Sequence, residues 1–409
     1  MIQSVFQTLG SRMSVAGLNF LLVVLCARWF GAEGMGKINL LKTELALLVL
    51  VAGFCGTSSL AYLASRFPLR YLYQAAIGGA VLLAMAGTVL LFLYNPGLPE
   101  SFFVILPILV FLLTMVQIQQ GLLLGAGELN GHNLTGIVLA ASQLMFVYWM
   151  VPGDSSQLSE DYARALRFSY SLTLIFSLVW LLKVWNTGTQ NSLFESTKAL
   201  YAYGFRAQLS NLVHFFNYRL TFYFLEYFSG NASLGKFSLG VSIAEAVWLI
   251  SQSIATVQYM KVSRADNPEE TIIPTIRFAW MSLGLAGLAV GGILILPESF
   301  FVRIFSEDFR ESVPVLYWLF PGILAQSFST QLAHYFSGRG MYGVNLWGSL
   351  IGVGMNAILG WLLIPYLGIQ GAAITASVAY VVIMIWQSLM FKRISGASWR
   401  VFRPFTGWK

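Results

Sequence analysis

The chain consists of long apolar runs separated by short polar stretches. A helix that crosses a bilayer needs about 20 apolar residues, so the length of each run is more informative than its periodicity. From Gly340 to Phe391 there is no charged residue. That stretch is too long for one span, and its break from Pro365 to Gly371 predicts two helices joined by a tight turn.

The same reasoning predicts twelve membrane-spanning helices and an all-α, polytopic fold. The expected spans are 9–30, 38–64, 74–94, 101–124, 132–151, 165–186, 206–228, 236–260, 275–297, 313–338, 341–365 and 370–391. No loop between them is long enough to form a soluble domain. We expect no cleavable signal peptide, because the first apolar run has full span length and lacks a small-residue cleavage site.

The composition agrees with a membrane protein. Of the 409 residues, 57% are hydrophobic and only 10% are charged, against about 25% in soluble domains. The mean hydropathy is +0.71. The two cysteines, Cys26 and Cys55, fall inside predicted spans and are interpreted as small buried residues rather than a disulfide.

The basic residues favour one orientation. Positively charged residues in short loops mark the cytoplasmic side of a membrane protein. Most of the 24 basic residues fall in the loops that are cytoplasmic if the N-terminus is inside, whereas Arg303 and Arg310 lie in an acidic loop of the other set. We therefore expect both termini in the cytoplasm. The net charge of +7 is then a topology signal and does not require a nucleic-acid partner.

Three short motifs recur in the two halves of the chain. Gly36-Lys37 matches Gly235-Lys236 at an offset of 199 residues, the G-x-N-L-x-G segments 131–136 and 343–348 match at 212, and Pro152 matches Pro365 at 213. Because six is an even number, two six-helix halves share one orientation in the membrane. The repeat predicts two pseudo-symmetric six-helix bundles around a central cavity. The expected divisions are an N-lobe (1–186), a cytoplasmic connector (187–205), a C-lobe (206–393) and a basic cytoplasmic tail (394–409).

Several segments resemble the polysaccharide flippases of the multidrug/oligosaccharidyl-lipid/polysaccharide superfamily. The similar segments are Ala27–Gly36, Tyr218–Thr221 with Leu234–Ser238, and Ile364–Ala373, within a resemblance that extends over residues 9–391. Thr221 stands where family members often carry an acidic residue, and Lys37 alters a Gly-x-Tyr pattern.

The resemblance implies a function as well as a fold. Members of the family move undecaprenyl-diphosphate-linked oligosaccharide from the inner to the outer leaflet of the bacterial cytoplasmic (inner) membrane by alternating access, for O-antigen (lipopolysaccharide), capsule or exopolysaccharide assembly. By that resemblance we expect a monomer in contact with membrane lipids, a polysaccharide polymerase and glycosyltransferases as partners, and coupling to a Na⁺ or H⁺ gradient or to the membrane potential.

Charged residues inside spans are candidates for function, because each costs about 2.5–3.5 kcal/mol on insertion scales. Arg219 shares a helical stripe with Gln208 and Glu226. It is predicted to face the cavity, where its forked guanidinium can bind a diphosphate. The alternative is an internal ion pair with Glu226 or Glu245 that only holds the lobe together.

The other candidates have equally plain alternatives. Arg12, Arg28, Lys42, Arg206, Gln120 and Gln331 are the remaining predicted substrate contacts, and Glu44, Glu226 and Glu245 are the predicted coupling or gating carboxylates. Arg28 could instead extend to the membrane surface, Arg12 and Arg206 could belong to the positive-inside signal, and the buried amides and carboxylates could serve packing.

Three rival functions remain open. A drug or small-cation antiporter of the same superfamily would need carboxylates in the cavity, and a scaffold without transport activity is a further alternative. A membrane glycosyltransferase or polymerase usually needs a large outer loop. No hydrolase triad, metal-ligand cluster or Walker loop occurs in the sequence, so no catalytic residue, metal or cofactor is expected.

Overall fold

The computed structural model describes residues 2–53, 57–64, 66–94, 102–153, 157–185, 192–263, 265, 267–396 and 398–403. Within these ranges the chain is helical and contains no strand. The elements are α1 (Ile2–Ala52), α2 (Thr57–Leu63), α3 (Leu69–Tyr94), α4 (Phe102–Gly125), α5 (Leu129–Met150), α6 (Leu158–Lys183), α7 (Leu193–Ser263), η1 (Pro268–Thr271), α8 (Ile272–Ile295), α9 (Glu298–Ile304), η2 (Glu307–Phe309), α10 (Ser312–Gly338), α11 (Tyr342–Ser395) and η3 (Trp399–Phe402).

Eight helices of the described ranges are long and apolar enough to cross a membrane. Three of them, α1, α7 and α11, bend at a glycine with positive φ: Gly31 (φ 61°), Gly230 (φ 78°) and Gly368 (φ 52°). Residues with a side chain rarely adopt a positive φ, whereas glycine adopts it readily because it has no Cβ. Each of these three helices therefore counts as two spans, which makes eleven with the other five helices. The twelfth is α10, a helix of 27 residues that is not among the eight. The prediction of an all-α, twelve-span membrane protein is confirmed.

The second predicted span differs in detail. We expected one helix over 38–64, but the helix that resumes after Gly31 ends at Ala52, and α2 begins only at Thr57. The turn starts at Gly53, whose N–H donates to Val49 O at 2.7 Å. Cys55 lies outside the described residues.

The chain divides into two compact units. The first comprises Met1–Phe30 and Leu40–Leu212, and the second comprises Gly31–Asn39 and Val213–Lys409. The first part of α7, from Leu193, therefore belongs to the first unit, and the segment expected as a connector over 187–205 is helical from that residue. The short segment 31–39 packs with the second unit although it belongs to the N-terminal half of the sequence.

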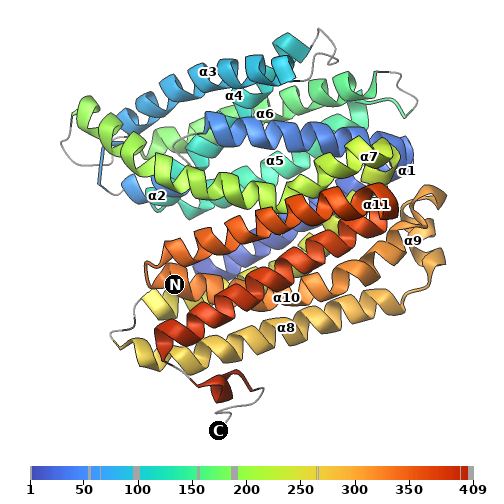
Figure 1. Ribbon diagram of the computed structural model, residues 1–409. Helices are drawn as coiled ribbons and strands as arrows, with labels where there is room; N and C mark the ends of the chain where they lie inside the picture. Colours follow the sequence, from blue (N-terminus) through green and yellow to red (C-terminus); the bar gives the residue numbers. More distant parts are fainter. Residues whose placement is uncertain are drawn as a thin grey trace. The chain divides into compact units, whose positions relative to one another are not determined.

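In the first unit α4 is the central helix. It contacts α2, α3, α5 and α6, which Figure 1 draws around it in blue to green. Leu69, Leu72, Leu122 and Leu123 are fully buried in its core. Burial of each such side chain contributes about 1.5–3 kcal/mol in water, but inside a bilayer close packing has to supply the attraction between helices.

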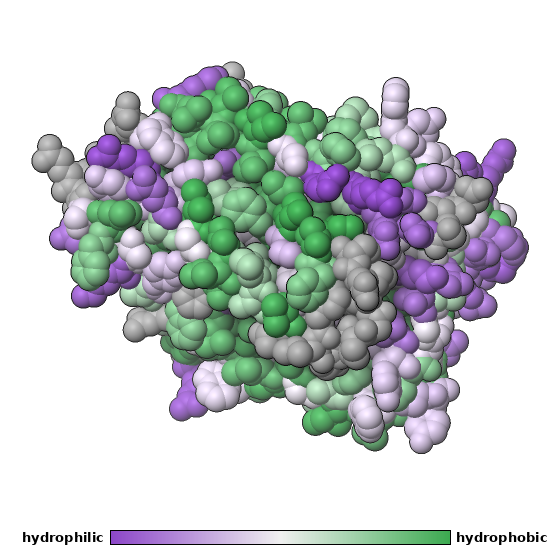
Figure 2. Space-filling model, turned by 90° about the horizontal axis from the view of Figure 1, so that it is seen from above, coloured by the Kyte–Doolittle hydropathy of each residue, from purple (hydrophilic) through white to green (hydrophobic). Residues whose placement is uncertain are grey.

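The outward faces of these helices are apolar. Leu82 and Met85 on α3, Val104 on α4 and Ile175 on α6 are each more than half exposed. Figure 2 shows hydrophobic residues exposed over much of the face that it draws, beside separate patches of hydrophilic residues. Exposed apolar side chains of this kind suit contact with the hydrocarbon of a bilayer.

In the second unit α10 lies between α8 and α11 (Figure 1). The core of the second unit contains the rings of Tyr335, Phe336 and Phe391, and the ring centroids of Tyr335 and Phe391 are 4.8 Å apart. The tail also packs on this core, because Trp280 Nε1 donates to the carbonyl oxygen of Phe402 at 3.0 Å.

The C-terminal ends of α4 and α10 have the same hydrogen-bonding pattern, at equivalent positions of the two halves. After α4, Glu128 N donates to Leu123 O at 2.9 Å, and after α10, Met341 N donates to Phe336 O at 2.8 Å. The residue before each donor, Gly127 or Gly340, has a positive φ. Both ends are thus Schellman caps, 213 residues apart.

Candidate functional site

The ion pair of Arg219 and Glu245 is the central feature of the candidate site. Both residues lie on α7, on opposite sides of its bend at Gly230. Arg219 Nη2 is 2.9 Å from Glu245 Oε1, and the two side chains are 27% and 41% exposed. The guanidinium also lies over the Phe222 ring, 4.8 Å from its centroid. Sequence analysis left Glu226 and Glu245 open as partners, and the structure pairs Arg219 with Glu245.

Aromatic rings and an amide surround this ion pair within the second unit. Tyr218, next to Arg219, has its ring centroid 5.6 Å from those of both Trp248 and Tyr380. Its hydroxyl accepts a hydrogen bond from Gln326 Nε2 at 2.6 Å. A pair of charges that is fixed by such neighbours keeps its position and can be presented to a ligand without further ordering.

Glu226 is the remaining carboxylate of the Arg219 stripe. It is partly exposed, and it forms no ion pair among the described residues. Gln208, the third member, is buried and donates to the carbonyl oxygen of Leu50 within the first unit. The stripe is therefore divided between the two units at Leu212, a division that helical periodicity does not reveal.

The first unit holds the other predicted charges. Glu44 is buried and Lys42 is half-buried, and both take part in interactions within the fold. Arg12 is exposed on α1. The side chain of Arg206 lies outside the described part of the chain, so its predicted role stays a prediction.

Arg28 lines a hollow next to the bend of α1 at Gly31, where the first span ends. The hollow has a volume of about 540 Å³, and its other walls are Trp29, Tyr148, Trp149, Val151, Pro152 and Gly153. The rings of Trp29 and Tyr148 are 5.2 Å apart at an interplanar angle of 31°. Sequence analysis identified Arg28 as a charge near a membrane surface but did not predict the aromatic walls.

The two predicted glutamines occupy different surroundings. Gln120 is partly exposed, and its backbone carbonyl oxygen lies 3.1 Å from His132 Nδ1. Gln331 is fully buried, and its Nε2 donates to Ser251 O at 2.9 Å and to Ser282 Oγ at 2.7 Å. The predicted role of Gln331 in binding substrate stays untested, but its amide nitrogen is already bonded inside the second unit.

Sequence analysis missed Gln119, the residue 212 positions before Gln331. Gln119 is fully buried in the first unit, where its Nε2 donates to the Tyr73 hydroxyl at 3.0 Å and its Oε1 accepts from Ser177. The repeat offset was the signal that could have found it. Gln119 and Gln331 are thus buried glutamines at equivalent positions, and each links three helices of its own unit.

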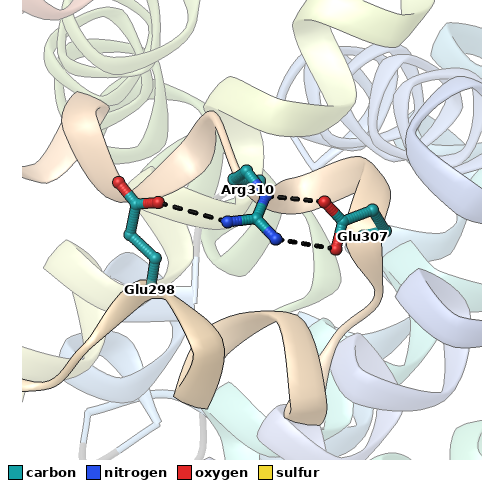
Figure 3. Close-up of polar contacts among 3 residues, drawn as sticks. All are labelled: Glu298, Glu307 and Arg310. Atoms are coloured by element: carbon teal, nitrogen blue, oxygen red, sulfur yellow. Dashed lines mark hydrogen bonds and ion pairs between the residues drawn. The ribbon is translucent and has the colours of Figure 1, made fainter.

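A second group of charges lies outside the spans. Arg310 forms a two-pronged contact with Glu307 (2.6 and 3.0 Å) and lies 3.5 Å from Glu298, as Figure 3 shows. The hydrogen bond from Arg310 lowers the pKa of Glu307. The neighbouring Asp308 accepts a hydrogen bond from Ala32 N at 3.3 Å, so this loop also holds the bend at Gly31.

No arrangement for a metal ion occurs in the described ranges: no three His, Cys, Asp or Glu side chains gather closely enough to hold one.

The comparisons with known proteins agree with the family resemblance. No protein-family model matches the chain. A probable low-salt glycan biosynthesis flippase of Haloferax volcanii, Agl15, is 24% identical over 380 residues, which cover 90% of this chain and 78% of that protein.

Three solved structures share the fold. The lipid II flippase MurJ in an inward closed conformation has a TM-score of 0.69, with 13% identity and coverage of 97% of this chain and 90% of its own. A transporter of the superfamily from Pyrococcus furiosus has a TM-score of 0.67, with 14% identity and coverages of 97% and 95%. An inward-facing multidrug resistance transporter has a TM-score of 0.65, with 15% identity and coverages of 96% and 99%.

The chain is therefore a multi-pass membrane protein with the fold of the multidrug/oligosaccharidyl-lipid/polysaccharide superfamily, and its predicted resemblance to the flippases of that superfamily is confirmed.

Proposed function

We propose that the chain is a flippase that moves a polyprenyl-diphosphate-linked oligosaccharide from the inner to the outer leaflet of a bacterial cytoplasmic membrane by alternating access. The relative from Haloferax volcanii and the lipid II flippase support a transporter of lipid-linked glycan rather than an enzyme. Undecaprenyl diphosphate as the carrier and an O-antigen, capsule or exopolysaccharide unit as the cargo are the finer parts of this proposal.

The observation that carries the proposal is the Arg219–Glu245 pair inside an apolar helix. An unpaired arginine in a span is costly, and Glu245 at 2.9 Å offsets that cost while no substrate is bound. A diphosphate offers several negatively charged oxygens to a forked guanidinium, in a two-pronged geometry that an ammonium cannot match. Diphosphate binding would therefore replace one Arg219–carboxylate contact with stronger ones.

The released Glu245 supplies a means of coupling. Once the diphosphate holds Arg219, the carboxylate needs a proton or a cation to balance its charge inside the membrane. Glu245 would then bind H⁺ or Na⁺ in one state and Arg219 in the other, and a gradient of that ion could drive the cycle.

Direct measurement of flipping tests this proposal. The full chain is reconstituted into liposomes with a polyprenyl-diphosphate oligosaccharide that carries a fluorophore on the sugar, and dithionite bleaches only the outer leaflet. We expect Arg219→Gln to slow flipping at least about tenfold, the loss expected of a charge-assisted hydrogen bond. Arg219→Lys should recover only part of the rate, because it restores the charge but not the fork.

The matched control is Arg164→Gln. Arg164 is 47% exposed and pairs with Glu160 and Asp161 on its own helix, so its replacement should leave the flipping rate unchanged. Wild-type flipping by a folded Arg219→Gln protein would contradict the proposed role of Arg219.

Antiport of a hydrophobic cation is the second candidate. The partly exposed Glu226, which has no ion pair in the described ranges, is the observation that favours it. Drug uptake into the same liposomes, driven by an imposed pH or Na⁺ gradient and abolished by Glu226→Gln, would support this function over flipping.

The orientation, location and partners complete the proposal. We propose that both termini face the cytoplasm, as the distribution of basic residues predicts, and that the protein supplies a polymerase after glycosyltransferases have built the glycan. Reporter fusions at the two termini, one active only in the cytoplasm and one only outside, test the orientation.

A further inference from the structure

The hollow beside Arg28 combines two kinds of binding surface. Its walls carry one guanidinium and three aromatic rings, those of Trp29, Tyr148 and Trp149. Tyr148 and Trp149 are 58% and 81% exposed, so their faces are open to a ligand. The volume of about 540 Å³ lies within the range of roughly 300–1,000 Å³ that is usual for small-molecule sites.

The backbone shapes the hollow. Helix α5 ends at Met150, and Val151 is extended (φ −108°, ψ 104°), which turns the chain away from the helix axis. Pro152 follows, and it has no N–H to continue the helix. A Cβ on Gly153 would lie 3.9 Å from the carbonyl oxygen of Trp29, so this turn lies beside the end of the first span.

The second unit repeats two of the three aromatic positions, without the cation and with Leu362 at the position equivalent to Trp149. Phe228 and Trp361 occupy the positions equivalent to Trp29 and Tyr148, at offsets of 199 and 213 residues, and their ring centroids are 5.3 Å apart. The position equivalent to Arg28 holds Tyr227. Tyr366, 87% exposed, stands at the position equivalent to Gly153.

This asymmetry separates two explanations. Tryptophan and tyrosine are enriched at both membrane interfaces, and that tendency accounts for the aromatic rings in both units. The enrichment of aromatic residues at interfaces does not account for Arg28 and Gly153, which line the hollow of the first unit. An arginine is suited to a phosphate, and aromatic faces are suited to the C–H faces of a sugar ring.

We infer that this hollow is a second binding site, which holds the sugar-phosphate part of the lipid-linked glycan at the outer surface of the membrane. The inference rests on the proposed function and on the proposed orientation, which place the end of the first span outside. Arg28 binds a phosphate oxygen, and Trp29, Tyr148 and Trp149 contact the adjoining sugar. The site gives the head group a place to bind after it leaves Arg219.

Protection from a membrane-impermeant maleimide tests the site. The full chain, with Cys26 and Cys55 replaced by alanine and with Gly153→Cys, is placed in phosphatidylcholine nanodiscs. The probe is a short polyprenyl diphosphate that carries one N-acetylhexosamine. We expect the probe to slow labelling at position 153. Arg28→Gln should raise the concentration for half-protection at least about tenfold, as the loss of one charge-assisted hydrogen bond predicts.

The equivalent position in the second unit supplies the control. Tyr366→Cys should be labelled at the same rate with and without the probe. Tyr148→Ala should weaken protection at position 153, whereas Trp361→Ala should not. Absence of protection, protection that survives in Arg28→Gln, or equal protection by phosphatidylglycerol would each overturn the inference, and the last result would identify an ordinary lipid site.

The test remains distinct from that of the proposed function. Protection in a protein that does not flip the lipid would leave the binding site standing and count against the flippase. Flipping without protection would support the flippase and overturn the site.

Discussion

Asn39 donates a hydrogen bond of 2.8 Å from its Nδ2 to Ser238 Oγ, and the two residues occupy equivalent positions, 199 residues apart, in the two halves of the chain. Each side chain also bonds its own helix, Asn39 to Met35 O at 2.9 Å and Ser238 to Gly235 O at 2.8 Å. Two equivalent residues that touch show that the repeated turns pack directly on each other. This contact explains why segment 31–39 is compact with the second unit.

A double-mutant cycle should detect this contact. The variants are Asn39→Ala, Ser238→Ala and the double mutant, and unfolding free energies are measured in detergent or bicelles. Interhelical hydrogen bonds in membranes average about 0.6 kcal/mol and reach about 1.7 kcal/mol, so we expect a coupling energy in that range. Strictly additive effects would mean that the contact does not stabilise the fold.

The glycines of the same turns should tolerate no side chain. A Cβ on Gly36 would lie 1.8 Å from Asn231 O, and a Cβ on Gly235 would lie 1.8 Å from Ala32 O. Because both obstacles are backbone atoms, we expect Gly36→Ala and Gly235→Ala to destabilise the protein by about 1–3 kcal/mol. The melting temperature of the detergent-solubilised protein is the measurement.

Gly284→Ala is the control for this prediction. Gly284 lies within α8, and a Cβ there would meet no atom within 4 Å. Alanine is the better helix former, so this variant should melt at or slightly above the wild-type temperature. A loss equal to that of Gly36→Ala would show that glycine content in general, and not the contact, determines stability.

Gln331→Ala should reveal whether this buried amide is structural. It would leave Ser282 Oγ without the hydrogen bond from Gln331 and remove one to Ser251 O, which costs about 1–3 kcal/mol for buried groups. Gln120→Ala should cost little, because the backbone carbonyl of residue 120 makes the contact to His132. An unchanged melting temperature with lost flipping in Gln331→Ala would instead favour the predicted contact with substrate.

The loop of Figure 3 should loosen at low pH. Hydrogen bonding to Arg310 lowers the folded-state pKa of Glu307 below its ordinary value of 4.5. A carboxylate with a lowered pKa stabilises the fold above its unfolded pKa, and this contribution is lost as the pH falls through the folded pKa. Hydrogen exchange of residues 298–311, corrected for intrinsic rates, should therefore increase as the pH falls below the ordinary pKa of 4.5.

Arg310→Gln is the comparison for the acidic loop. Without the guanidinium, Glu307 should titrate near its ordinary value, and the exchange of the loop should be faster at neutral pH and change less on acidification. A wild-type loop whose exchange is independent of pH across this window would contradict the assignment.

The sequence predicted the spans well because run length follows directly from the thickness of the bilayer. The bend at Gly368 lies inside the predicted turn from Pro365 to Gly371, and the bends at Gly31 and Gly230 are 199 residues apart, as the repeat required. The break after Ala52 was not predicted, because residues 38–64 were assigned to a single span.

The candidate site was predicted less completely. Helical spacing placed Arg219, Gln208 and Glu226 on one stripe, whereas the partner of Arg219 is Glu245, which the sequence offered only as one of two possible partners and which lies beyond the bend. Spacing along one straight helix cannot describe a contact across a bend. The aromatic walls beside Arg28 were not predicted either, because Tyr148 and Trp149 come from a different helix, α5.

Removing both charges of the central pair should separate support of the fold from binding of substrate. Arg219→Gln leaves the Glu245 carboxylate without its partner at a site where both side chains are partly buried, so we expect a lower melting temperature. The double variant Arg219→Gln/Glu245→Gln has no uncompensated charge, and its two amides can bond each other, so stability should return. Flipping should stay at least about tenfold below wild type, because no guanidinium remains for the diphosphate. If the double variant regained both stability and flipping, Arg219 would be a structural partner of Glu245, and the diphosphate would have to bind elsewhere.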